Sequence, residues 1–78
     1  PNPFNPTTQV SFTLPLDGYV GLYVFDLKGE QVDIIYEGFQ QNGNHSYTWD
    51  ASNLSSGVYY VRMVSNENSM TVKAMLLK

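Results

Sequence analysis

The side chains that could do chemistry are few in this sequence, and their spacing forms no recognisable reactive set. His45 is the only histidine and there is no cysteine, so neither a thiol nucleophile nor a cysteine zinc site is available. A single histidine cannot define a Ser/His/Asp triad, because such triads are recognised by geometry rather than by residue type. The sequence also has no phosphate-binding glycine loop and no metal-spaced histidine pair. We therefore expect a protein that is not an enzyme and that uses no cofactor.

Two groups of residues leave room for ligand binding. Four aspartates fall in or near predicted turns, where the carboxylate favours local backbone hydrogen bonds; they are Asp17, Asp26, Asp33 and Asp50. A calcium site built from two of them is an alternative, although no D-x-D-x-D-G loop is present. A sugar-stacking platform is another, made of the outward aromatic side chains of Tyr19, Tyr23, Phe25 and Tyr60. The simpler interpretation is that these aromatic residues occupy strand positions because they favour strands.

The composition is typical of a small β-domain with little charge. In 78 residues the formal net charge is −3, charged residues make up 14% and aromatic residues another 14%. A basic surface for nucleic acid is therefore not expected, while the aromatic content favours strands. The apolar runs are only a few residues long, too short for a membrane-spanning helix. Because the sequence begins with Pro1, we expect the chain to be cut from a longer polypeptide.

Hydrophobic periodicity predicts a series of short strands separated by turns rich in glycine, asparagine and aspartate. Residues 1–8 contain three prolines and are expected to form an extended leader ahead of a folded domain at 9–78. The predicted strands are 9–14, 19–26, 31–37, 45–49, 58–65 and 70–77, with a loop at 38–44. This spacing predicts an all-β fold, an antiparallel sandwich, with a small open barrel as the alternative.

Two of the predicted strands are apolar on both faces. In 19–26, Val20, Leu22 and Val24 share one face while aromatic residues occupy the other, which favours a central position in a sheet. In 31–37 the two adjacent isoleucines, Ile34 and Ile35, break the alternation. Either both faces of this strand are covered or a β-bulge shifts its register near residues 33–34.

The stretch 45–63 is expected to organise the core. Trp49 is the only tryptophan, and a side chain of that size can anchor a domain this small. We expect Tyr59, Val24 and Phe12 to pack with it. Outward-facing apolar positions on the last two strands form a candidate partner surface, consisting of Val58, Tyr60, Met75 and Leu77.

The ordered motifs of the whole chain resemble a known family. They are residues 1–8 (PNPFNPTT), 11–15 (SFTLP), 24–26 (VFD) with Gly29, His45 with Trp49 and Asp50, 56–60 (SGVYY), and Lys73 with the ending 76–78 (LLK). In combination they resemble the type A C-terminal sorting domain of the type IX secretion system. Part of the pattern also resembles the Ig-like domain of the flagellar hook-capping protein. Those relatives tend to have glycine where Ala51 follows Asp50, which favours the sorting domain.

The resemblance implies a fold, a role and a set of recognition residues. The fold would be a small antiparallel Ig-like β-sandwich of about six to seven strands. The domain would stand at the C-terminus of a secreted cargo protein of Bacteroidetes-type bacteria, be recognised in the periplasm and pass through an outer-membrane translocon to the cell surface. In many cargoes of this family a sortase-like peptidase then removes the domain. The family motifs map onto Pro1, Asn2 and Pro3, onto Gly57 and Tyr59, and onto Lys73 and Lys78.

A second hypothesis belongs to another functional class. The domain would be a structural or adhesive Ig-like surface module that self-associates, by exchange of the last strand or as a filament subunit. The outward positions Tyr60, Met75 and Leu77 would then contact another copy.

Overall fold

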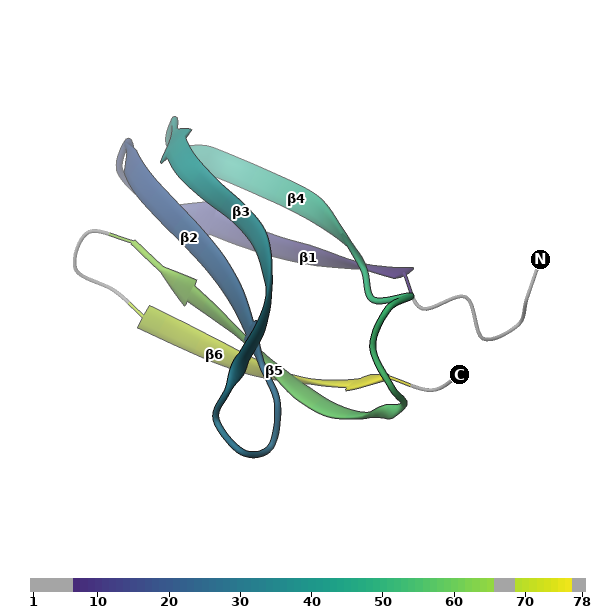
Figure 1. Cartoon of the computed structure of the whole chain (residues 1–78). Coiled ribbons are helices and arrows are strands. Elements are labelled where there is room, and N and C mark those ends of the chain that lie inside the picture. The colour runs from purple at the N-terminus through teal and green to yellow at the C-terminus, as the bar shows by residue number, and fades with distance from the viewer. Residues whose placement is uncertain (1–6, 66–68, 77–78) are drawn as a thin grey trace.

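Two antiparallel sheets face each other and form a small sandwich (Figure 1). The computed structural model describes residues 7–65 and 69–76, with side chains described for 7–65. The strands are β1 (Thr7–Leu14), β2 (Gly18–Phe25), β3 (Gln31–Gln40), β4 (Gly43–Asp50), β5 (Gly57–Val64) and β6 (Ser69–Leu76). One sheet has the order β1-β4 and the other has the order β3-β2-β5-β6. The predicted all-β antiparallel sandwich is confirmed, and its first strand begins at Thr7 rather than at residue 9.

The alternation of β1 and β4 places apolar side chains between the sheets. Val10, Phe12 and Leu14 face the interior from β1, while the residues between them are exposed. Tyr47 and Trp49 do the same from β4. A strand that is half buried on one face shows this period of two.

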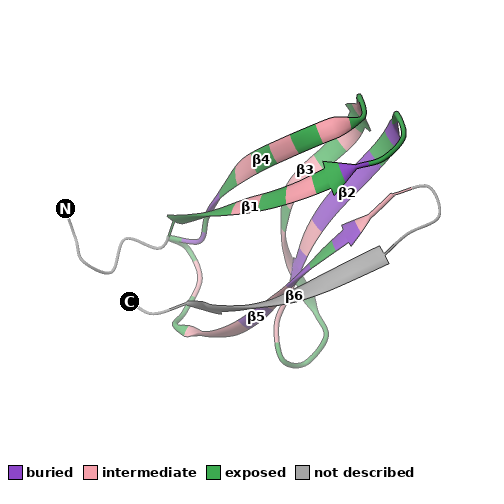
Figure 2. Ribbon diagram, turned by 180° about the vertical axis from the view of Figure 1, so that it is seen from behind, coloured by how far each residue is buried: buried purple, intermediate pink, exposed green. Residues whose placement is uncertain are grey.

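The centre of the core is β2, which lies between β3 and β5 as predicted for a strand that is apolar on both faces. Val20, Leu22 and Val24 are fully buried. They connect two apolar clusters, one around Trp49 and Tyr59 and the other around Leu14 and Met63. Figure 2 shows the buried residues concentrated on β2 and β5, whereas β1 and β4 alternate between half-buried and exposed residues.

The irregular strand β3 contains two register shifts against β2. Leu22 and Tyr23 pair with Tyr36 and Ile34, which leaves Ile35 as an extra residue, and a second shift leaves Val32 extra. Both extra residues pack against the core, whereas Ile34 is 47% exposed. Of the two alternatives for this strand, the bulge is therefore the one that the structure shows.

The prediction of a loop over residues 38–44 is wrong in its bounds, because β3 continues to Gln40 and β4 already begins at Gly43. The ring of Tyr36 lies over Gly38, where an added Cβ would come within 2.7 Å of the Tyr36 hydroxyl oxygen. Because Gly38 has no side chain, the strand has room for the aromatic ring of Tyr36 at this position. Gly43 has a φ of 121°, which suits glycine and permits the tight connection between the two sheets.

Candidate functional site

Tyr59 closes the corner where the chain passes from β4 to β5. Its ring is buried, and its hydroxyl donates a hydrogen bond to the carbonyl oxygen of Ser55, 2.7 Å away. A tyrosine near the start of a strand, bonded to backbone a few residues upstream, is the tyrosine corner of immunoglobulin-like sandwiches. The connection is further held by Asp50, which accepts a hydrogen bond from the backbone N–H of Ser52. Tyr59 therefore supports the shape of this end of the molecule from inside.

Trp49 lies beside Tyr59 and links the two sheets. The two rings meet edge to face, with centroids 6.1 Å apart. The indole Nε1–H donates to a carboxylate oxygen of Asp33, at 3.0 Å, across from β4 to β3. Val24 is fully buried in the same cluster, whereas Phe12 is half-buried and lies in the other, against Tyr47. The part of the core nearest the β4–β5 corner is thus built on Trp49.

Gly57, the first residue of β5, has no conformational need to be glycine. The described glycines with positive φ are Gly29 and Gly43, so the backbone conformation of Gly57 is one that other residues adopt. An added Cβ at Gly57 would meet the Tyr59 Cε2 atom at 3.8 Å, an ordinary van der Waals contact. The fold itself therefore accommodates a small side chain at this position.

The outer surface around the start of β5 is hollowed and partly apolar. A shallow hollow of about 200 Å³ is bordered by Gly57, Val58, the largely buried Tyr59 and the β2–β3 turn. A second, of about 330 Å³, lies between the exposed Leu27 of that turn and Tyr60. We call this region the β5 entry surface, and define it as Gly57, Val58, Tyr60, Asp26 and Leu27.

The β2–β3 turn that borders the β5 entry surface is held rigidly. The carboxylate of Asp26 accepts hydrogen bonds from the backbone N–H groups of Lys28 and Glu30, each at 2.9 Å. Gly29 adopts a φ of 85°, as its place in a turn predicts. The hollows beside β5 therefore have a wall of fixed shape.

The register of β6 places the last strand beside the β5 entry surface. Gly57 pairs with Leu76, Val58 with Met75, and Tyr60 with Lys73. The same pairing puts Lys73 across from Tyr60, which is itself paired with Phe25 of β2. Pro1, Asn2, Pro3, Leu77 and Lys78 lie outside the described residues, and the outward positions predicted for Met75 and Leu77 concern side chains outside the described set.

One end of the sandwich therefore brings together segments that are far apart in the sequence. The beginning of β1, the beginning of β5 and the end of β6 lie at the same end in both views (Figures 1 and 2). The β2–β3 turn lies beside the start of β5, because Phe25 pairs with Tyr60 and the turn borders the same hollow as Gly57.

The other candidate ligand groups are used within the fold. Asp17 accepts from the backbone N–H of Asn42, and the ring Nε2 of His45 lies 2.6 Å from the carbonyl oxygen of Gln41. No group of three or more metal-binding side chains occurs among residues 7–65. The face of the Phe25 ring is occupied by the guanidinium of Arg62, 5.2 Å from its centroid.

On the outer face of β2, Tyr23 makes a specific polar contact. Its hydroxyl donates to a carboxylate oxygen of Glu37 at 2.8 Å. This hydrogen bond, together with the neighbouring Tyr19, raises the pKa of Tyr23 above its usual range. The ring lies over Gly21, where an added Cβ would come within 2.4 Å of the tyrosine oxygen.

Sequence reasoning missed the roles of Asp33, Glu37 and Gly21. The signal for Asp33 is a carboxylate among the apolar residues Val32, Ile34 and Ile35, in a chain with a single indole donor that has to be buried. For Gly21 the signal is a glycine inside a strand two residues from a tyrosine, because a flat ring needs an open neighbour.

The part of the chain that the structure describes has no helix that could cross a membrane. No curated protein and no solved structure matches the chain. A family model, that of the secretion system C-terminal sorting domain, matches residues 1–78. Because the match spans the whole sequence, this chain belongs to the family of C-terminal sorting domains, the sorting signals of type IX secretion.

Proposed function

We propose that the type IX machinery recognises this domain as a folded object, at the end where β5 begins and β6 ends. The observation that carries the proposal is the register that places Gly57 beside Leu76 and Tyr60 beside Lys73. Motif positions separated in the sequence become one surface only in the folded state. An outer-membrane translocon would bind this surface, and a sortase-like peptidase would act on the cargo afterwards.

The contrast between Gly57 and Tyr59 supports a direct role for the first and an indirect one for the second. Tyr59 is buried and bonded to the backbone of Ser55, so its contribution is to the fold. Gly57 is not required by backbone conformation or by packing. A requirement for glycine at residue 57 would therefore originate in a partner that occupies the adjoining hollow.

The position of β6 supports access to the last strand. Among residues 7–65 and 69–76, β6 pairs with β5 alone and is an edge of the four-stranded sheet. An edge strand presents unpaired backbone groups that a binding partner can use. The upstream cargo would be carried to the cell surface or the exterior by this recognition, from the periplasm of a Bacteroidetes-type bacterium.

The test is export of a reporter fused ahead of the chain in a bacterium with a type IX system. We expect Gly57→Glu to reduce export strongly, because it places a charged side chain at the edge of the hollow. Asn53→Glu is the matched control, since it adds the same charge to an exposed position of the nearby β4–β5 connection. Thermal unfolding of both purified variants verifies that they fold.

Truncation gives an independent arm of the experiment. Deletion of residues 76–78 removes the end of β6, and we expect it to abolish export. If the truncated chain is exported as well as the full one, recognition does not use the last strand. Equal export of Gly57→Glu and Asn53→Glu would show that the secretion machinery does not recognise the β5 entry surface.

A self-associating surface module remains the second candidate function. The outer face of the four-stranded sheet supports it, because Tyr19, Ile34 and Phe39 are exposed there, the last to 66%. Contiguous exposed apolar residues mark interaction surfaces. A reporter that is not exported but that assembles through this face would favour the module over the sorting signal.

A further inference from the structure

The two-stranded sheet of this molecule has an unusually regular free edge. β1 pairs with β4 through eight consecutive residue pairs, from Thr7 with Asp50 to Leu14 with Gly43, without a register shift. Its other edge has no partner within the described chain. A two-stranded sheet is only marginally stable by itself, so an added strand would stabilise it.

The sequence of β1 lacks the devices that normally protect an edge strand. Natural edges are blunted by charges, prolines, bulges or shortness. Thr7–Leu14 reads TTQVSFTL, with neither a charged residue nor a proline. The strand is thus long, uncharged and straight in register.

The other sheet edges of the described chain differ from β1 in this respect. β3 has two bulges and the acidic residues Asp33 and Glu37. β6 includes the charged residue Lys73. β4 ends in the charged residue Asp50, and its beginning is only two residues away from the end of β3. The undefended edge is therefore β1.

The side-chain pattern of β1 is complementary to itself. In an antiparallel pair of two β1 strands centred on Ser11, Val10 of one copy is opposite Phe12 of the other on the inner face. On the outer face Ser11 is opposite Ser11, and Gln9 is opposite Thr13. At the centre of the pair apolar residues thus meet apolar ones and polar residues meet polar ones, the arrangement that stabilises cross-strand pairs, whereas at its ends Leu14 is opposite Thr8.

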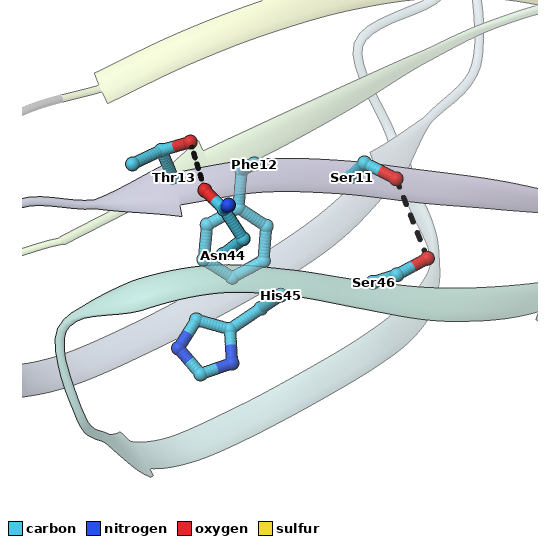
Figure 3. A pocket seen from close by; sticks show the side chains of 6 residues that line it. All are labelled: Ser11, Phe12, Thr13, Asn44, His45 and Ser46. Atoms are coloured by element: carbon cyan, nitrogen blue, oxygen red, sulfur yellow. Dashed lines mark hydrogen bonds between the residues drawn. The ribbon is translucent and has the colours of Figure 1, made fainter.

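The outer face of the β1–β4 sheet is already organised as such a polar ladder. Ser11 donates to the Ser46 hydroxyl oxygen at 3.3 Å, and Thr13 donates to the Asn44 side-chain oxygen at 2.8 Å (Figure 3). These side chains are exposed and uncharged, and a shallow hollow runs along them. A second copy would continue the ladder by one further pair of strands.

We propose that β1 is a homodimer interface, in which two copies pair their β1 strands about a twofold axis through Ser11. The result is a continuous sheet in the order β4-β1-β1-β4. Val10 and Phe12, which are half-buried in one copy, gain cover from the second copy. This surface is separate from the β5 entry surface, so the proposal does not depend on the proposed function.

The test compares two lysine substitutions on the same exposed cross-strand pair. Ser11→Lys places two like charges opposite each other at the twofold axis, whereas Ser46→Lys places its charge on β4, away from the axis. Both variants lose the hydrogen bond between the two serines, and Ser46→Lys also loses the bond that Ser46 donates to Gln9. The oligomeric state of each purified chain is measured by analytical ultracentrifugation over a range of concentrations, and circular dichroism checks that each is folded.

We expect the unsubstituted chain to form dimers and Ser11→Lys to weaken dimerisation about fivefold or more, because like charges directly opposite are destabilising. Ser46→Lys should dimerise like the unsubstituted chain. A mixture of Ser11→Lys with Ser11→Glu should restore dimers, even if each variant alone is monomeric, which guards against a simple folding defect.

Three results would overturn the proposal. The first is an unsubstituted chain that stays monomeric at every concentration. The second is an equal loss of dimers in Ser11→Lys and Ser46→Lys. The third is open-ended assembly in place of dimers, because β1 would then pair with β4 of the next copy in a head-to-tail manner.

Discussion

Trp49 shows how a single side chain can connect both sheets of a very small domain. Its ring is 4% exposed and packs edge to face on Tyr59, while its N–H reaches Asp33. The carboxylate of Asp33 also accepts a hydrogen bond from the backbone N–H of Ile34, inside the irregular part of β3. A buried indole N–H needs an acceptor, and a charged acceptor makes the stronger bond. The carboxylate thus satisfies the indole donor and the backbone of β3 at once.

On the outer face of β2, Tyr23 makes a hydrogen bond that depends on a neighbouring glycine. Because Gly21 has no side chain, the tyrosine ring lies along the strand and its hydroxyl reaches Glu37 on β3. The hydroxyl can donate this bond only while it is protonated, and a phenolate beside a carboxylate would be repelled. This is why the pKa of Tyr23 is raised.

Alkaline pH should therefore weaken the fold through Tyr23. Its pKa is higher in the folded chain than in the unfolded chain, where it is about 10. The stability that the contact contributes is complete below that unfolded value and is lost as pH rises through the folded value. Urea unfolding at a series of pH values should show stability falling above about pH 10.

Two variants test the origin of this pH dependence. Tyr23→Phe should reduce the alkaline slope because it removes the titrating group, and Glu37→Gln should reduce it because it removes the carboxylate charge while retaining an acceptor oxygen. An unchanged slope in both variants would assign the pH dependence to other tyrosines.

At the scale of the strand, β3 is the element in which sequence periodicity and structure diverge. Simple alternation can place either Ile34 or Ile35 inward, since both are isoleucine. The bulge decides the matter by inserting Ile35 as an extra residue, so that it packs on the core while Ile34 is exposed. A β-bulge redirects side chains locally in this way.

Lysine substitution of each isoleucine tests the bulge. We expect Ile35→Lys to destabilise the fold by about 2 kcal/mol or more, because it places a charged side chain at a half-buried position against the core. Ile34→Lys should cost about 0.5 kcal/mol, as is usual for surface positions. Chemical denaturation of both variants measures the difference, and a larger cost at residue 34 would contradict the bulged register.

How far the sequence predicts the fold depends on the element. The alternation in β1 and the two apolar faces of β2 predict half-buried and central strands, because burial acts on every second side chain. The continuation of β3 through residues 38–40 is not predictable in this way. Glycine normally interrupts a strand, and here the ring of Tyr36 from the same strand covers it.

The candidate site was predictable only in part. The burial of Tyr59 against Trp49 was predicted, whereas the hydrogen bond from Tyr59 to Ser55 and the half-buried position of Gly57 beside a hollow were not. Burial at the β4–β5 corner depends on contacts with Trp49, which are distant in sequence.

At the scale of the whole molecule, stability and recognition are coupled. A chain of 78 residues buries only about 60% of its unfolded surface, so its margin of stability is small. A sorting signal that is read as a folded surface fails when the domain unfolds, whichever residue was changed. Loss of export alone therefore does not identify a recognition residue.

Export plotted against folding stability separates the two kinds of residue. Tyr59→Phe loses the hydrogen bond to Ser55 and should cost about 1 kcal/mol, a fall in Tm of about 4–8 °C. Trp49→Ala should cost about 3–5 kcal/mol and leave the domain largely unfolded. We expect export of these core variants to follow the folded fraction at the growth temperature, so Tyr59→Phe is exported and Trp49→Ala is not. Gly57→Glu should fall well below that relation, folded but not exported, because its effect is on the surface that the partner contacts. If its export instead matches that of a core variant of equal stability, the β5 entry surface acts only through the fold.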